Sequence, residues 1–387
     1  MFIDIDCIQK RKNKEHTCGD YFISKRYPEI SRLIAVLSDG LGSGIKAHIL
    51  SCMTATMMAK FIEAGKDIKK ASEIIMESLP ICQIRKISYS TFSAIDCNED
   101  GSVKIVEEGN PSFIWIHNSQ IIEPEYVTVS SKKFTDRKVQ VYNITLEEND
   151  RLIFCSDGIT QSGLGTQKFK LGLRRQGLAD IVTNVLKIAP TISSRDLSRH
   201  IISEALKCEE DLLPKDDMSA MCLFFRNPRQ ALVFTGPPYH NQRDNFYANI
   251  FKDFKGKKAI CGGTTANLIS RELNIPIENG KILASGSLPP MSYMKGVDLV
   301  TEGILTLTRA YEYLEQDEPV TNDDPAGRLT DFLLNSDCIT FMIGAKINQA
   351  HYDPNLPIEI EIRKNIMKKI GHILETRYIK KVIFQYM

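Results

Sequence analysis

The pattern of apolar and polar positions in the first half of the chain predicts alternating strands and helices. The segment "RLIAVLSDG", residues 32–40, is an almost continuous apolar run, which is typical of a strand buried on both faces. The next segment, "IKAHILSCMTATMMAKFIEAG", is too long for a strand and is apolar almost all round. We therefore expect a helix that is buried over most of its surface, followed by an amphipathic helix in "KDIKKASEIIMESLPIC".

The pattern then changes to short apolar runs that are separated by turn residues. Between residues 87 and 146, runs such as "ISYSTFSAIDC", "GSVKIVEEG", "PSFIWIHN" and "KVQVYNITL" predict a meander of antiparallel strands. A further strand, "RLIFCSDG", residues 151–158, precedes polar loops and helices. The half closes with an acidic turn that leads into the strand "DDMSAMCLFF". The expected fold class is therefore α+β.

A second pattern starts after the short polar joint "RNPRQ", residues 226–230. Strand-like runs such as "ALVFTGPP", "KAICGG", "KILASGS" and "CITFMIGAK" alternate there with helix-like segments such as "NFYANIFKDFKG", "TTANLISRELN" and "VDLVTEGILTLTRAYEYLEQ". Such alternation is typical of an α/β domain, here the smaller of the two. We place the boundary near Pro228, which gives domains of residues 1–227 and 228–387.

Composition and charge narrow the class of protein. A length of 387 residues suits two domains, and a net charge of +1 gives no reason to expect nucleic acid or a membrane surface as a partner. The ten cysteines are scattered without a C-x-x-C pair, which favours a reduced, cytoplasmic compartment. The N-terminal "MFIDIDCIQKRKNKEH" lacks the apolar core of a signal peptide, and no apolar run reaches the length of a membrane span.

Acidic residues recur where the predicted strands of the first half begin or end. Asp39 and Asp157 each follow an apolar run in the sequence Ser-Asp-Gly, the pair Asp216-Asp217 precedes the last strand, and Asp20 precedes the first. Two carboxylates about 4 Å apart repel each other by about 4 kcal/mol at an effective dielectric near 20, so three or four together would raise one another's pKa values or require cations. Carboxylate oxygens suit Mg²⁺ or Mn²⁺. The alternative is that each aspartate caps a turn, since Asp-Gly is a common turn dipeptide; the recurrence in one domain favours the metal interpretation.

The order "GD … SDGLGSG … GNPSFIW … DRLIFCSDG … DDMS" resembles the metal-dependent protein Ser/Thr phosphatases (PPM), and within them the bacterial SpoIIE-like branch. The resemblance extends from Cys18 to Phe225. It implies a sandwich of two antiparallel β-sheets flanked by helices, with a two-metal site at one end. It also implies that the substrate is a regulatory protein that carries phosphoserine or phosphothreonine.

The resemblance assigns roles to individual residues of this chain. Asp39 matches the acid that bridges two Mn²⁺ or Mg²⁺ ions, and Gly40 matches the glycine whose carbonyl binds one of them. Asp157 and Asp216 match further ligands. Asp20 matches an acid that holds metal-bound water. Asp39, Asp157 and Asp216 are thus the implied catalytic set, and a water activated by the two ions would attack phosphorus without a phospho-enzyme.

Some positions lie beside this set or depart from the family pattern. Asp217 is expected to support the ligands rather than to bind metal. Many eukaryotic members carry a histidine after the Asp-Gly, where this chain has Leu41, so the general acid is unassigned. Lys25 and Arg26 are candidates for binding phosphate only by proximity to Asp20. The main alternative to a phosphatase is a pseudophosphatase or signalling scaffold that acts through binding by the C-terminal domain, and the retained acids argue against it.

The C-terminal domain matches no family that its residues identify, and we expect a regulatory or partner-binding role. Its best local feature is a predicted strand that runs into Gly262, Gly263, Thr264 and Thr265, which open a helix. The N–H groups at such a turn attract anions, so a small anionic ligand or a phosphorylated partner protein is one interpretation. A simple capped turn is the other. An enzymatic role for this domain is a third hypothesis, and a homodimer is compatible with the sequence.

Overall fold

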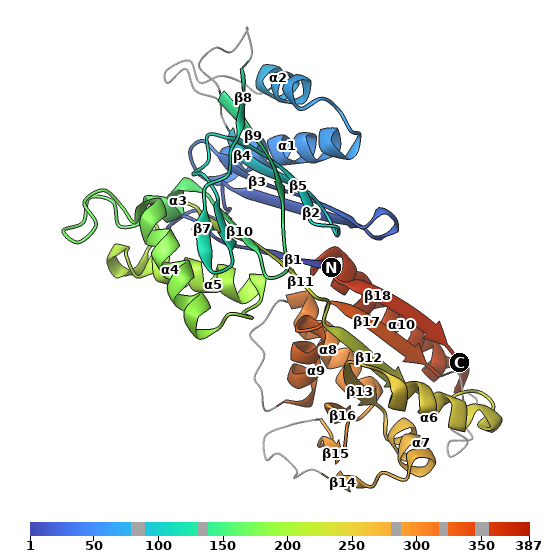
Figure 1. The fold of residues 1–387 in the computed structure, drawn as a ribbon. Helices are drawn as coiled ribbons and strands as arrows, with labels where there is room; N and C mark the ends of the chain where they lie inside the picture. The colour runs from blue at the N-terminus through green and yellow to red at the C-terminus, as the bar shows by residue number, and fades with distance from the viewer. Residues whose placement is uncertain (79–89, 131–137, 280–287, 317–323, 345–355) are drawn as a thin grey trace. The chain divides into compact units, whose positions relative to one another are not determined.

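Two antiparallel sheets form the first of the two units into which the computed structural model divides, Met1–Asn227 and Pro228–Met387 (Figure 1). The structure describes all residues except 79–89, 131–137, 280–287, 317–323 and 345–355. No helix in the described part of the chain has the length and apolar character needed to cross a membrane. Each unit is described by itself below.

Both sheets of the first unit are antiparallel throughout. One has the strand order β1 (Phe2–Lys10), β11 (Met218–Arg226), β10 (Arg151–Cys155), β6 (Ile114–His117), β7 (Gln120–Ile122). The other has the order β2 (Tyr21–Tyr27), β3 (Arg32–Gly40), β4 (Ser90–Asn98), β5 (Ser102–Glu108), β9 (Lys138–Thr145), β8 (Val127–Ser130). The predicted meander is therefore present, and its strands are divided between the two sheets.

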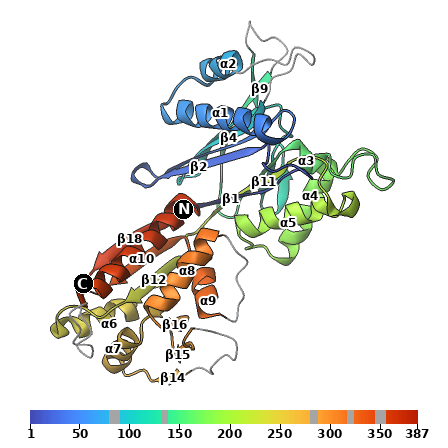
Figure 2. The ribbon, with the colours of Figure 1, turned by 180° about the vertical axis from the view of Figure 1, so that it is seen from behind.

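Helices cover the outer faces of this sandwich (Figures 1 and 2). Helix α1 (Gly44–Glu63) packs on the six-stranded sheet and α2 (Ile68–Ser78) packs beside α1. The five-stranded sheet is covered by α4 (Arg174–Ile188) and α5 (Ser194–Leu206), and the short α3 (Asp157–Thr160) follows β10. The expected α+β sandwich flanked by helices is confirmed.

Helix α1 differs from the expectation of a helix buried over most of its surface. Its inner face buries small residues and Met58 against the sheet. On its outer face Ile45, Ile49 and Met53 are exposed at a spacing of one helical turn. The prediction that α1 is buried over most of its surface is therefore wrong: one face packs on the sheet, and apolar residues of the other face are exposed.

The second unit is a mostly parallel sheet with helices on both faces. Its strand order is β14 (Ile277–Asn279), β15 (Ser292–Met294), β16 (Leu299–Thr301), β13 (Lys257–Cys261), β12 (Gln230–Thr235), β17 (Cys338–Ile343), β18 (Lys381–Tyr386). The last five strands in this order are parallel to one another. Helices α6 (Asp244–Asp253) and α7 (Gly263–Leu273) pack on one face, and α8 (Ile304–Gln316), α9 (Pro325–Leu334) and α10 (Leu356–Thr376) on the other.

The expected smaller α/β domain is thus confirmed, with one difference in its elements. The segment "VDLVTEGILTLTRAYEYLEQ", predicted as one helix, contains strand β16 before helix α8 begins. The predicted strand "KILASGS" lies outside the described residues. Strand β1, at the N-terminus, was not predicted, because its alternating acids mask its apolar positions.

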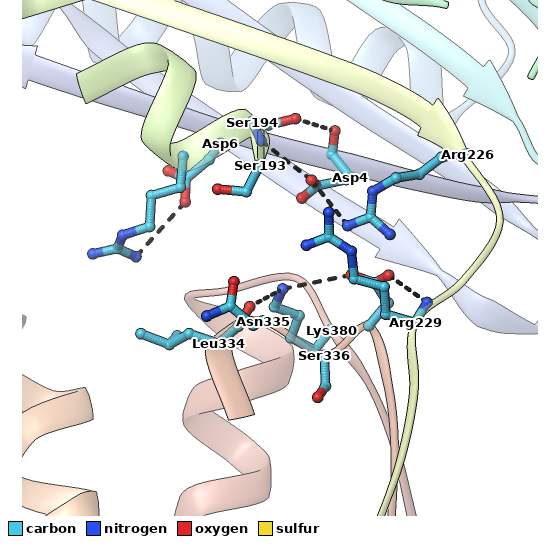
Figure 3. A network of polar contacts seen from close by, with 12 residues as sticks. Asp4, Asp6, Ser193, Ser194, Arg226, Arg229, Leu334, Asn335, Ser336 and Lys380 are labelled. Atoms are coloured by element: carbon cyan, nitrogen blue, oxygen red, sulfur yellow. Dashed lines mark hydrogen bonds and ion pairs between the residues drawn. The ribbon is translucent and has the colours of Figure 1, made fainter. Parts of the chain in front are cut away.

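The residues on either side of Asn227-Pro228 are each fixed within their own unit (Figure 3). In the first unit Arg226 Nη2 donates to Asp4 Oδ2 at 3.1 Å, and both side chains are nearly buried. In the second unit the N–H of Arg229 donates to Asp337 Oδ2 at 2.7 Å, and Asp337 is fully buried. The joint between the anchored residues is therefore very short.

Glu107 places a carboxyl group inside the sandwich. In β5 the side chain of Glu107 points to the same face of the sheet as those of Val103 and Ile105. Val106 points to the opposite face, which packs under α1. The Ser93 hydroxyl donates to Glu107 Oε1 at 3.1 Å, and Oε2 has no partner among the described residues. Burial raises the pKa of Glu107 to about 8, against the weaker lowering effect of the bond from Ser93.

The protonation of Glu107 predicts a pH-dependent stability. The folded state holds this proton up to about pH 8, whereas the unfolded chain releases it near the ordinary value of 4.5, so the free energy of unfolding should fall as pH rises between those values. Glu107→Gln should make that fall smaller. Urea unfolding followed by the fluorescence of Trp115, the only tryptophan, reports on this unit. The control is Glu125→Gln at an exposed position, and an equal fall in both variants would contradict the prediction.

Candidate functional site

The predicted acids lie at the ends of strands in the first unit. Asp39 is the penultimate residue of β3, and Asp157 follows β10 by two positions as the first residue of α3. Asp216 and Asp217 directly precede β11, and Asp20 directly precedes β2. The charges of Asp20, Asp157 and Asp216 each raise the pKa of Asp39, so these carboxyl groups lie near one another. The structure therefore brings together acids that are almost 200 positions apart in the sequence.

Close backbone contacts explain the glycine that follows Asp39. A Cβ built on Gly40 would overlap the carbonyl oxygen of Ala47 in α1 and would lie 2.9 Å from the carbonyl oxygen of Gly19. The φ angle of Gly40 is not positive, so the requirement is for space rather than for a special conformation. The end of β3 is thus pressed against the start of α1 and against the residue that precedes Asp20.

The same explanation applies to the glycine that follows Asp157. A Cβ on Gly158 would overlap the carbonyl oxygen of Asp217. A Cβ on Gly19 would lie 2.8 Å from Asp217 Oδ2. Asp217 therefore touches both the segment that carries Asp157 and the segment that carries Asp20. Three glycines allow the four acidic segments to approach one another.

Asp20 is almost completely buried and is held by serine hydroxyls. Ser219 Oγ donates to Asp20 Oδ2 at 2.6 Å. The pKa of Asp20 is raised to about 7. Burial is the largest cause and the charges of Asp217 and Asp157 add to it, while hydrogen bonds from Ser219 and Ser156 act in the opposite direction. These serines were not predicted as part of the site. The sequence signals that could have indicated them are the Ser-Asp-Gly motif, which contains Ser156, and the Asp-Asp-Met-Ser segment, which ends at Ser219.

Asp39 is the most strongly perturbed acid of the group. The pKa of Asp39 is raised to about 10, chiefly by burial and in addition by the charges of Asp20, Asp157 and Asp216. Asp157 accepts a hydrogen bond at 2.8 Å from the Gln161 side chain, which is one turn further along. Such a raised pKa means that the group of acids does not carry its full negative charge at neutral pH.

Asp216 and Asp217 are neighbours with different environments. Asp216 is about half exposed, with Lys12 Nζ 3.9 Å from its Oδ1, and burial raises its pKa. Asp217 is only 4% exposed and accepts the backbone N–H of Lys12 at 2.9 Å through Oδ1. Its Oδ2 has no hydrogen-bond partner among the described residues. Asp216 is therefore available to a ligand, whereas Asp217 joins segments of the protein.

The oxygen donors of this site fit divalent cations such as Mg²⁺ or Mn²⁺. The fit rests on the raised pKa of Asp39, since its cause is partly repulsion that a bound cation would remove. Among the described residues, however, no three or more His, Cys, Asp or Glu side chains are gathered closely enough to form a complete ligand set. The acids are thus neighbours whose charges raise one another's pKa values, but they are not gathered into a complete metal-binding set.

The basic residues near the acids have structural partners. His48 of α1 lies with Nδ1 2.9 Å from the Cys18 carbonyl oxygen, and the edge of its ring meets the Tyr21 ring. Lys25 pairs with Glu63 at 3.2 Å. The Arg26 side chain is buried and pairs at 3.3 Å with Glu99, in the turn between β4 and β5. These contacts account for Lys25 and Arg26 without a phosphate ligand.

In the second unit, the predicted anion-binding turn forms the junction between β13 and α7. Gly262 has φ of +137° and precedes Gly263, the first residue of α7, and no side chain caps this end of the helix. Thr264 is exposed and Thr265 is buried. A separate cavity of about 470 Å³ lies at the edge strands and is lined in part by residues 291–295. The turn and the cavity are therefore different features.

Comparisons with known proteins identify the first unit. The sequence model described as "Stage II sporulation protein E (SpoIIE)" matches residues 30–226. Stage II sporulation protein E of Bacillus subtilis is 27% identical over 190 residues, which is 48% of this chain and 21% of that protein. The protein of the same name from Priestia megaterium is 22% identical over 190 residues, with 48% and 30% covered.

A solved structure gives a further comparison. The PP2C phosphatase domain of SpoIIE from Bacillus subtilis, with a fragment of its regulatory domain, is 22% identical, covers 58% of this chain and 63% of that chain, and has a TM-score of 0.46. The chain spans less than a third of the length of the two curated relatives. Because the family match extends over slightly more than half of the chain, the protein belongs to the stage II sporulation protein E (SpoIIE) family.

Proposed function

We propose that this protein is a protein-serine/threonine phosphatase, which hydrolyses phosphoserine or phosphothreonine on a regulatory protein with the help of divalent cations. The observation that carries the proposal is the family match over residues 30–226, because that segment contains Asp39, Asp157 and Asp216. Asp20 lies just before the matched segment, and its contact with Ser219 supports its membership of the same site.

The residues proposed to hold two Mg²⁺ or Mn²⁺ ions are Asp39, Asp157 and Asp216, together with the carbonyl of Gly40. The bound ions would lower the pKa of a shared water molecule and neutralise the phosphoryl oxygens. The charges of Asp20, Asp157 and Asp216 each raise the pKa of Asp39, so the Asp39 carboxyl group lies among the other acids that would hold the ions. Asp216, whose side chain is about half exposed, is proposed to lie at the entrance to the site.

Asp20 is proposed to orient water in this site. The Ser219 hydroxyl fixes the direction of Asp20 Oδ2 through a 2.6 Å bond. Ser219 is in turn level with Gln9 of β1, whose side-chain amide donates to it at 3.0 Å. This chain of bonds holds the buried carboxyl group of Asp20 in one orientation.

The role of the second unit and the setting of the protein are also proposals. A regulatory or partner-binding role fits a unit that contains none of the acids. The phosphoprotein substrate is proposed to be a regulatory protein, and the cytoplasm is the proposed location. The rival hypothesis of a pseudophosphatase or scaffold is weakened by the presence of all the acids and by their mutual pKa effects.

The first prediction concerns the metal ions. Hydrolysis of an aryl phosphate should require Mn²⁺ or Mg²⁺ and should stop with a chelator, and Asp39→Asn, Asp157→Asn and Asp216→Asn should each lower turnover by at least ~100-fold. Adding the ions should also raise the unfolding temperature followed by Trp115 fluorescence, because they relieve carboxylate repulsion.

Two measurements would contradict this prediction. One is turnover that survives exhaustive chelation. The other is near-normal turnover in any of the three variants, which would remove that residue from the ligand set. The matched control is Asp100→Asn in the exposed turn between β4 and β5, which should behave like wild type. In chelator, Asp39→Asn should unfold at no lower temperature than wild type, since the uncharged asparagine needs no proton to occupy this buried place among the other acids.

The second prediction separates Asp217 from Asp216. Asp217→Asn keeps an oxygen that can accept the Lys12 N–H, so we expect a milder loss of turnover than in Asp216→Asn. Because the Asp217 side chain joins segments, Asp217→Ala should lower the unfolding temperature more than Asp216→Ala. If Asp217→Asn instead abolishes the cation-dependent stabilisation while Asp216→Asn keeps it, the two roles are reversed.

The third prediction concerns the location of activity. A chain of residues 1–227 should retain basal aryl phosphate hydrolysis within about tenfold of the full chain, because every proposed ligand lies before Pro228. Steady-state kinetics of both chains at saturating Mn²⁺ would measure this. If the shorter chain folds by Trp115 fluorescence and is inactive, the second unit contributes to catalysis itself.

A further inference from the structure

Two neighbouring connections of the second unit diverge at the carboxyl end of its parallel sheet. Strands β13 and β16 are paired, with Cys261 opposite Thr301. The connection from β13 enters α7 on one face of the sheet, and the connection from β16 enters α8 on the other. In open α/β sheets, ligands bind in the crevice that such divergence creates outside the carboxyl ends of the strands.

Glycines lie on both connections at this end of the sheet. A Cβ built on Gly303 would lie 3.7 Å from the Cα of Gly262, so the two connections lie against each other. A Cβ built on Gly263 would meet nothing within 4 Å, and its φ angle is not positive. Gly263 is therefore not required by packing or by conformation. It is the first residue of an eleven-residue helix, where N–H groups lack partners within the helix.

Buried oxygen atoms without partners occur on both connections. Thr265 is fully buried, its Oγ1 lies 3.4 Å from the position of a Cβ on Gly262, and it has no hydrogen-bond partner among the described residues. On the other connection, Glu302 Oε2 and Thr306 Oγ1 are also buried atoms without a hydrogen-bond partner among the described residues, and Thr306 is fully buried. An unsatisfied buried polar group is costly. The two hydroxyls can donate to an anion, and the carboxylate requires a donor.

We propose that this end of the sheet binds a phosphate ester that carries free hydroxyl groups, of the class to which sugar phosphates and nucleoside phosphates belong. The phosphate would lie at the N-terminus of α7, against Gly263, Thr264 and the Thr265 hydroxyl. Glu302 would accept a hydrogen bond from a hydroxyl of the ester. Glu302 disfavours an isolated phosphate, because two negative groups at close range repel. The ligand therefore needs both an anion and a neutral donor.

The experiment is calorimetric titration of the full chain in chelator, so that the phosphatase site cannot consume the ligand. The probes are inorganic phosphate, ribose 5-phosphate, adenosine 5′-phosphate, adenosine and a phosphoserine peptide. Ribose 5-phosphate and adenosine 5′-phosphate should bind, inorganic phosphate should bind more weakly, and adenosine should not bind. Tighter binding of adenosine 5′-phosphate than of ribose 5-phosphate would identify a nucleotide as the source of the phosphate.

Thr265→Val tests the hydroxyl directly. It should weaken binding of both esters by at least ~10-fold, because a donor to the phosphate is lost. It should leave the unfolding temperature unchanged or higher, because the hydroxyl has no hydrogen-bond partner in the described part of the chain. The matched control is Thr330→Val, a fully buried helical threonine whose hydroxyl donates to the Ala326 carbonyl at 2.8 Å. It should leave binding unchanged.

Two further variants complete the test. Gly263→Ala should weaken binding of every phosphate probe without loss of stability, because its methyl group occupies the open space and alanine favours a helix. Glu302→Gln should reduce the preference for esters over inorganic phosphate.

The proposal is overturned if no ester binds the wild type, or if Thr265→Val and Gly263→Ala both bind normally. It is also overturned if only a phosphoserine peptide binds, since the partner would then be a protein. None of these outcomes depends on phosphatase activity.

Discussion

The structure of the first unit depends on the close approach of Asp217 to two other chain segments. Its carbonyl oxygen occupies the space beside Gly158, and its side chain occupies the space beside Gly19. Gly40 is in turn packed against Gly19 and Ala47. Any side chain at these glycines would force apart segments that carry Asp20, Asp39 and Asp157. The acidic site is therefore a consequence of backbone packing, and its charges are brought together against their own repulsion.

Because of that repulsion, the raised pKa values of these acids do not stabilise the fold, and they point instead to a functional role for the acids. Buried carboxyl groups with raised pKa values lower the stability of the folded state at neutral pH. Asp39 receives this penalty from burial and from three neighbouring acids. Asp20 is partly compensated by hydroxyl donors from Ser219 and Ser156. A fold that needed only turn caps at these positions would gain nothing from placing them so close, which favours the metal interpretation over the capped turns.

Much of this architecture could be predicted from the sequence, because apolar periodicity reflects burial. The strands at residues 32–40 and 151–155 and most helices of the second unit were predicted from such runs. Strand β1 was missed because acids occupy its inner end, where Asp4 pairs with Arg226, which is distant in sequence. The partition of the meander between two sheets, and the exposure of Ile45 on α1, depend on tertiary contacts that no local pattern records.

The candidate site was predictable in its acids and not in its supporting residues. Ser-Asp-Gly at two strand ends is a local signal, whereas the contact of Asp217 with Gly158 joins residues far apart in the sequence. Gly40 and Gly158 are required because another carbonyl group fills the space beside them, while the space beside Gly263 is open. A glycine that neighbouring backbone requires is explained by the fold. The glycine at the start of α7 lies beside open space with a buried hydroxyl nearby, and neither packing nor conformation requires it. This contrast is the reason for proposing a ligand site in the second unit.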